Sequence, residues 1–248
     1  MSRRKRKEKQ FKTRFKESTH LKVITGGQVE QQIRYSRDVK IIPRNFKQDD
    51  LLDLLTDSTK PIVFATGPAG TGKTLISTLY AIQQFKKGEI NKIVITRPAV
   101  SVDEQHGFLP GTLQEKMAPW TRPIFDIFEE FYHPKEIEQL IDSNKIEIAP
   151  LAYMRGRTFK DSIILADEMQ NATKEQMKML LTRIGDNSKL IVNGDLNQHD
   201  RGFDTNGLKD FLEQLRSRNS AMIGTVEFTE KEVERHPVVT EVLGIYSN

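Results

Sequence analysis

Eight consecutive residues have the spacing of a phosphate-binding loop, G-x-x-x-x-G-K-[ST]. They are Gly67, Pro68, Ala69, Gly70, Thr71, Gly72, Lys73 and Thr74. Glycines let successive backbone N–H groups turn toward phosphate oxygens, and the N-terminus of the following helix adds the positive end of its dipole. The lysine of such a loop reaches the β- and γ-phosphates, and its last hydroxyl binds Mg²⁺. The sequence therefore predicts a site for a nucleoside triphosphate.

Two adjacent carboxylates, Asp167 and Glu168, follow an apolar run at 162–166. At the carboxyl end of a strand, Asp167 is expected to hold Mg²⁺ through water. Glu168 is expected to polarise the water that attacks the γ-phosphate. An acidic pair after a strand can also be a solvated helix start, but the phosphate loop earlier in the chain favours the catalytic interpretation.

A third polar turn follows the apolar run at 189–193. Its Gln198 is expected to hydrogen-bond the γ-phosphate or the attacking water, and so to sense which nucleotide is bound. Taken alone, this segment would be an ordinary turn built on Asn193, Gly194 and Asp195. Because this segment follows the other two motifs in the chain, we favour the sensor role for Gln198.

The composition of the 248 residues excludes several kinds of chemistry. The chain has no cysteine, so disulfides, a thiol nucleophile and cysteine-based metal sites are excluded. Its five histidines are scattered and do not have the spacing of a metal site. No carboxylate cluster beyond Asp167 and Glu168 indicates a nuclease. No apolar run reaches the ~18 residues that span a bilayer, and the basic start lacks the apolar core of a signal peptide. We therefore expect a cytoplasmic protein without a membrane partner.

The positive charge is concentrated in residues 1–16, which hold nine Lys or Arg and one acid. The whole chain has 38 basic and 34 acidic residues, so the remainder carries a net charge of −4. Such a run is expected to be disordered and to contact nucleic acid, although a merely solubilising terminus is the alternative.

Short apolar runs alternate with helical patterns from residue 61 onward, which is typical of a mostly parallel sheet flanked by helices. The runs lie at 62–66, 92–96, 145–149, 162–166, 189–193 and 222–228. A first helix is predicted over 46–56. A later helix should begin after a capping box at Thr173 and Gln176, continue to Ile184 and end at Gly185.

The pattern predicts one domain over 44–248, preceded by a strand or hairpin extension at 17–43. The stretch 98–144 is long for a connection between strands, so we expect it to be an insertion of two or three helices.

Together these motifs resemble the PhoH family of P-loop ATPases, from about residue 38 to the C-terminus. The matching words are PRNFKQ at 43–48, TRPAV at 96–100, GFLPG at 107–111, YMRGRTF at 153–159, DEMQN at 167–171, NGD at 193–195 and VERHPVV at 233–239. The family usually has alanine where this chain has Met169, which should not affect the chemistry. The resemblance implies a RecA-like core similar to the first lobe of superfamily-one helicases, with the sensor strand between the two motif strands.

The resemblance also implies roles for two residues outside the main motifs. Gln48 matches a position that reads adenine through its amide, but Asn45 and Gln48 also form a cap pair for the first helix. Arg97 lies in a segment that touches the nucleic-acid backbone in helicases, with a plain strand end as the alternative.

Phosphoryl transfer gains from a cation on the developing γ-phosphate charge, often supplied by a neighbouring subunit. Arg235 is the preferred candidate, and Arg155 and Arg157 are the others. Any of the three could instead be an ion-pair partner.

The resemblance implies an ATPase that uses ATP and Mg²⁺ and acts on single-stranded RNA or DNA as a helicase-like motor. The alternatives are a nucleotide-gated binding subunit with little turnover and a small-molecule P-loop kinase. Because the chain has room for one lobe only, the second wall of the site is expected from another copy, in a homo-oligomeric ring that is hexameric by analogy.

Overall fold

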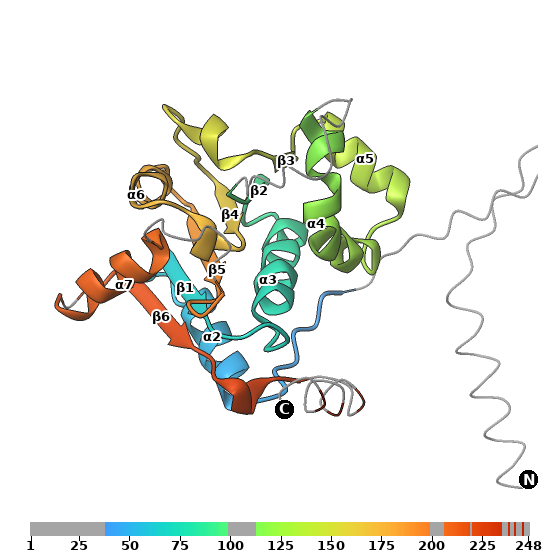
Figure 1. Ribbon diagram of the computed structural model, residues 1–248. Coiled ribbons are helices and arrows are strands. Elements are labelled where there is room, and N and C mark those ends of the chain that lie inside the picture. Colours follow the sequence, from blue (N-terminus) through green and yellow to red (C-terminus); the bar gives the residue numbers. More distant parts are fainter. Residues whose placement is uncertain are drawn as a thin grey trace, which may run out of the picture. The chain divides into compact units, whose positions relative to one another are not determined.

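Six short parallel strands form the sheet at the centre of the computed structural model (Figure 1). They are β1 (Ile62–Thr66), β2 (Lys92–Thr96), β3 (Ile146–Ile148), β4 (Ser162–Ala166), β5 (Lys189–Gly194) and β6 (Ile223–Glu227). The structure describes residues 38–98, 113–198, 206–218 and 220–234, with Val238, Glu241 and Ile245. The predicted basic tail 1–16, residues 17–37 of the predicted extension 17–43, and Arg235 lie outside the described residues.

The strand order is β3-β2-β4-β5-β1-β6, so β5 lies between β1 and β4. In the register, Ala65 of β1 lies opposite Asn193 of β5, and Ala166 of β4 lies opposite Val192. This is the RecA-like arrangement that the sequence predicts. Because all the strands are parallel, the carboxyl ends of β1, β4 and β5 meet at one edge of the sheet, where ligands of open α/β sheets bind.

Helices cover both faces of the sheet (Figure 1). One face packs against α2 (Phe46–Thr56), α3 (Lys73–Lys87), α4 (Leu113–Glu129) and α5 (Pro134–Asp142), and the other against α6 (Lys174–Leu181) and α7 (Gly207–Arg216). The alternation of side chains along each strand divides the core accordingly. For example, Val63 and Ile93 belong to the first apolar cluster, and Phe64 and Val94 to the second.

Local signals explain where most of these helices begin. The side chain of Asn45 accepts a hydrogen bond from the backbone N–H of Gln48 at the start of α2. Thr173 and Gln176 form the predicted capping box of α6. Helix α4 contains Trp120 and lies in the described part of the 98–144 stretch, as does α5. Among the residues that the structure describes, none of the helices is both long and apolar enough to cross a membrane.

Helix α6 ends earlier than its apolar periodicity predicts. Its last residue is Leu181, whereas the sequence predicts a helix to Ile184. The reason is a competing partner, because Phe159 donates its N–H to the Arg183 carbonyl and accepts the N–H of Gly185, at 2.9 and 2.7 Å. A backbone group that pairs with a neighbouring segment cannot also serve the helix.

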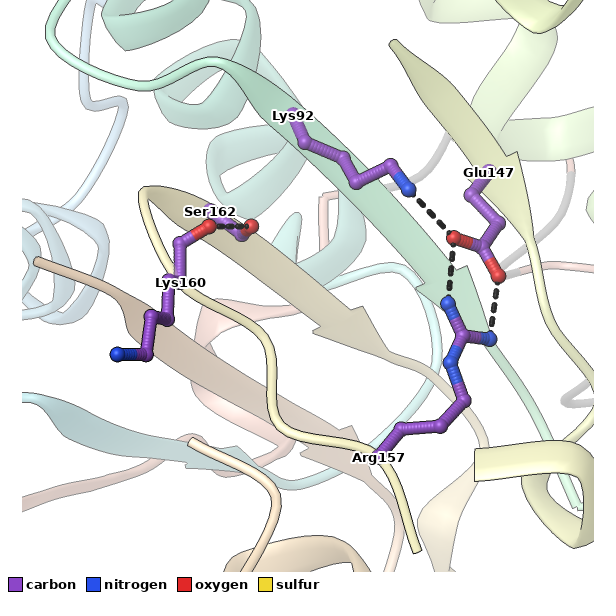
Figure 2. Close-up of polar contacts among 5 residues, drawn as sticks. All are labelled: Lys92, Glu147, Arg157, Lys160 and Ser162. Carbon is purple, nitrogen blue, oxygen red and sulfur yellow. Dashed lines mark hydrogen bonds and ion pairs between the residues drawn. The ribbon is translucent and has the colours of Figure 1, made fainter. Parts of the chain in front are cut away.

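One carboxylate, that of Glu147, joins two cations beside β2 and β3 (Figure 2). Lys92 Nζ lies 2.7 Å from Glu147 Oε2, and the Arg157 guanidinium donates to both carboxylate oxygens at 2.5 and 2.9 Å. The Arg157 guanidinium also lies over the Phe159 ring, at 4.5 Å from its centroid. The hydrogen bond from Arg157 and the nearby Lys92 hold the pKa of Glu147 below its ordinary value. Arg157 is therefore an ion-pair partner, one of the roles that the sequence leaves open for it.

Substitution Glu147→Gln should destabilise the protein by about 2 kcal/mol at pH 7, because two cations lose their charged acceptor. A lowered pKa in the folded state stabilises the fold above the unfolded pKa of about 4.3, and this contribution is lost as the pH falls through the folded value. The difference in unfolding temperature between the wild type and the variant should therefore be largest near neutral pH and shrink in acid.

Thermal unfolding from pH 3 to 7 measures this difference, with exposed Glu138 changed to Gln as the control. Equal unfolding temperatures for the wild type and Glu147→Gln at pH 7 would contradict the stabilising role.

Candidate functional site

The loop between β1 and α3 has a backbone that only glycine adopts readily. Gly67, Gly70 and Gly72 have φ values of +132°, +84° and +84°. A Cβ added to Gly67 would lie 2.3 Å from the carbonyl oxygen of Phe228, and one added to Gly72 would lie 2.6 Å from a side-chain atom of Gln48. The loop is therefore enclosed by other elements, and its fixed glycines are required by space as well as by torsion.

Lys73 is the first residue of α3, and its ammonium lies inside the loop. It donates to the carbonyl oxygens of Gly67 and Pro68, both at 2.6 Å, and to Thr71 Oγ1 at 3.2 Å. An ammonium has three N–H donors, and these contacts use all three. Burial lowers the pKa of Lys73, and the nearby carboxylates of the site oppose that effect.

The outward carbonyls of the loop are also occupied by protein donors. Gln48 donates from Nε2 to the Thr71 carbonyl at 3.0 Å, and the backbone N–H of Glu234 donates to the Gly70 carbonyl at 2.9 Å. The carbonyls of Gly67, Pro68, Gly70 and Thr71 are therefore bonded within the protein and do not face a ligand as free acceptors. This arrangement suits an anion such as phosphate.

Thr74 and Asp167 bring two oxygen ligands together across the end of the sheet. Thr74 Oγ1 donates to Asp167 Oδ1 at 3.1 Å, and the backbone N–H of Asp167 donates to the Thr96 carbonyl at 3.0 Å. Burial raises the pKa of Asp167, as does the neighbouring charge of Glu168. A hydroxyl and a carboxylate that lacks solvent are ligands that Mg²⁺ accepts, with water and phosphate oxygens as the others.

Glu168 follows directly and has an unusual backbone, with φ +54°. Left-handed conformations of non-glycine residues cost about 1–3 kcal/mol and cluster at functional sites. The Glu168 side chain is 39% exposed, and its Oε1 lies 4.0 Å from Arg97 Nη2. Arg97 also donates from Nη1 to the carbonyl of Trp120 in α4, at 3.0 Å. Glu168 is thus accessible to water while a cation stands beside it.

Gln198 ends the segment after β5, and its backbone N–H donates to the Asp195 carbonyl at 3.2 Å. Its side chain is exposed and lines a cavity of about 260 Å³. The other lining residues come from the loop, α3 and the ends of β4 and β5: Ala69, Gly70, Gly72, Lys73, Thr74, Leu75, Asp167, Glu168, Gly194 and Asp195.

The structure brings most of the sequence-predicted residues to this cavity. Gln48 does not line the cavity and instead contacts the loop through the Thr71 carbonyl. Arg235 lies outside the described residues, although Glu234 just before it contacts the loop. Sequence reasoning missed the support that Gln48 and Glu234 give to the loop, and the buried amide of Gln170 beside Glu168. The only sequence signal for Gln170 was its place in the family motif DEMQN at 167–171, which does not indicate what the residue does.

Comparison with known proteins gives one family. The model described as "PhoH-like protein" matches residues 40–247. A PhoH-like protein of Mycobacterium tuberculosis (strain ATCC 25618 / H37Rv) is 42% identical over 212 residues, which are 85% of this chain and 59% of that protein. Protein PhoH of Escherichia coli (strain K12) is 40% identical over 248 residues, 98% of this chain and 69% of that protein. This chain thus spans well under two thirds of the mycobacterial relative.

Among solved structures, the SWI2/SNF2 ATPase core of Sulfolobus solfataricus in complex with dsDNA is similar to 64% of this chain and 33% of that chain. The TM-score is 0.40 at 12% identity.

Substitution Gln48→Ala removes the donor that holds the Thr71 carbonyl, so the loop should lose order. We expect the affinity for GDP, and at least equally the affinity for ADP, to fall by roughly tenfold. Isothermal titration measures both constants. Asn45→Ala is the control, because it removes the cap of α2 and leaves the bond to Thr71 in place. Undiminished binding of both nucleotides to Gln48→Ala would show that the loop does not need this support.

Proposed function

Because the chain belongs to the PhoH-like protein family, we propose that it is a magnesium-dependent ATPase that acts on single-stranded RNA or DNA. The observation that carries the proposal is the convergence of Lys73 and Thr74, at the start of α3, with Asp167 and Glu168, at the end of β4, on one cavity. Each has the chemistry that one part of phosphoryl transfer to water requires.

In this proposal the loop and the N-terminus of α3 bind the β- and γ-phosphates, and Lys73 neutralises charge on them. Thr74 and Asp167 would hold Mg²⁺, which neutralises phosphate charge when it is bound. The carboxylate of Glu168 accepts a proton from the attacking water, whose oxygen then bonds to the γ-phosphorus as the bond to ADP breaks. Gln198 contacts the γ-phosphate or that water.

Gln48 is proposed to read adenine as well as to support the loop. Its amide donates one N–H to the Thr71 carbonyl and accepts the backbone N–H of Arg44 at 2.8 Å. A side-chain amide has two N–H donors and two acceptor lone pairs, so it has one of each left for an adenine base. If so, Gln48→Ala should lose ADP binding beyond the loss that it shares with GDP.

Arg97 supports a link to nucleic acid, because a single guanidinium adjoins both Glu168 and the carbonyl of Trp120. A phosphate group of a bound RNA or DNA strand near Arg97 would then change the electrostatic environment of the Glu168 carboxylate. The basic residues of 1–16 would add affinity without sequence preference, through release of counterions.

The missing wall of the site is proposed to come from another copy of the chain, in a ring of six subunits. Arg235 would supply the cation for the transition state. Light scattering with and without nucleotide, together with the concentration dependence of turnover, tests this part independently.

Phosphate release with and without single-stranded RNA or DNA tests the function. The wild type should release phosphate from ATP, and more of it with nucleic acid present.

Lys73→Ala should lose both turnover and most nucleotide binding, because the γ-phosphate loses its cation. Glu168→Gln should bind ATP normally and release phosphate at least 100-fold more slowly, since only water activation is lost.

A wild-type rate for Glu168→Gln would contradict the assignment of the base. Tight ATP binding without any phosphate release by the wild type would instead indicate the nucleotide-gated binding subunit.

A further inference from the structure

The side chain of Gln170 connects the ends of β4 and β5 behind the proposed water-activating carboxylate. Gln170 lies in the short 3-10 turn η2 (Met169–Asn171), and 1% of it is exposed. Its Nε2 donates to Glu168 Oε2 at 2.5 Å, and its Oε1 accepts the backbone N–H of Asp195 at 3.0 Å. A single buried amide therefore bonds the carboxylate and the first residue after β5.

The space for this amide depends on Gly194. A Cβ at Gly194 would lie 2.5 Å from Leu208 Cδ2 and 3.0 Å from Gln170 Oε1, so that Leu208 would have to shift and the Gln170 amide would be crowded. The last residue of β5 therefore leaves the room that Gln170 fills. A buried amide is costly unless it is bonded, and both the nitrogen and the oxygen of the Gln170 amide take part in this bridge.

Arg97 also faces the Glu168 carboxylate, and its Nη2 lies 4.0 Å from Oε1. That separation is at the limit of an ion pair, whereas the bond from Gln170 is short. The backbone of Glu168 is in the left-handed region, a conformation that persists only where the surrounding contacts hold it. Gln170 is the better placed of the two to do so.

Beyond Asp195, the bridge continues toward Gln198. Asp195 Oδ1 accepts the N–H of Asn197 at 3.0 Å, and its carbonyl accepts the N–H of Gln198 at 3.2 Å. The segment that carries the proposed γ-phosphate sensor is thus hydrogen-bonded to Glu168 through one glutamine.

We propose that Gln170 is a positioning residue, which fixes the Glu168 carboxylate for water activation and ties it to the segment that carries Gln198. The inference rests on the proposed ATPase function and deepens it. Contact with the γ-phosphate at Gln198 would be transmitted along hydrogen bonds to the group that activates water, so that the base is held in place when the triphosphate is bound.

Two variants separate the two bonds of the bridge. Gln170→Met keeps the volume and removes both bonds. Gln170→Glu keeps an acceptor for the Asp195 N–H but places a second carboxyl group against Glu168, so that the two share a proton and Glu168 is no longer a free base. Both should lower kcat by roughly 10- to 100-fold, the effect of a misplaced reacting group, with the dissociation constant for ATP unchanged.

Hydrogen exchange of the Asp195 amide, measured without nucleotide, gives a readout that does not depend on turnover. It should become faster in Gln170→Met and stay slow in Gln170→Glu. The matched control is Gln176→Met, which loses a bond of the same length from Thr173 N–H in the neighbouring helix. That variant should lose stability and keep kcat.

Full kcat in both Gln170 variants, while Glu168→Gln is inactive, would overturn the inference and leave the ATPase function intact. Slow exchange of the Asp195 amide in Gln170→Met would equally overturn it. If the wild type released phosphate no faster than Lys73→Ala, both the function and the inference would fall.

Discussion

A buried ammonium must have its charge compensated, and this requirement at Lys73 organises the whole site. Its three donors go to two carbonyls of the loop and to one hydroxyl. Burial lowers the pKa of Lys73, and the nearby carboxylates of Asp195, Asp167 and Glu168 oppose that effect. A phosphate that enters the cavity meets a cation held inside the loop, and Lys73 exchanges some of these protein contacts for phosphate oxygens when the phosphate binds.

The sheet provides the geometry on which this compensation depends. Since β5 lies between β1 and β4, the loop, the carboxylates and the sensor segment leave the sheet at adjacent points of one edge. Residues that do not line the cavity support those that do. Gln48 and Glu234 hydrogen-bond to the loop, and Gln170 joins the ends of β4 and β5. The groups that we propose to touch substrate are therefore supported by other groups behind them.

Much of this arrangement could be predicted because its signals are local in the sequence. The loop motif and the acidic pair define their own chemistry, and apolar runs located the strands to within two residues at either end. Pairings between distant residues carry no such signal. The bond from Gln48 to the Thr71 carbonyl, the salt bridge of Arg157 with Glu147 and the bridge through Gln170 emerge only when the chain is folded. The early end of α6 has the same origin, because Phe159 competes for its backbone.

The central claim is that the polar edge of the sheet is a site for ATP hydrolysis, and a crystal structure with Mg²⁺, ADP and aluminium fluoride tests it most directly. We expect the β-phosphate inside the loop at residues 67–74, the metal on Thr74 Oγ1 with Asp167 linked through water, and a water on Glu168 in line with the aluminium. A nucleotide bound elsewhere, or one bound in the loop with Glu168 turned away from the fluoride and no water on it, would contradict the account.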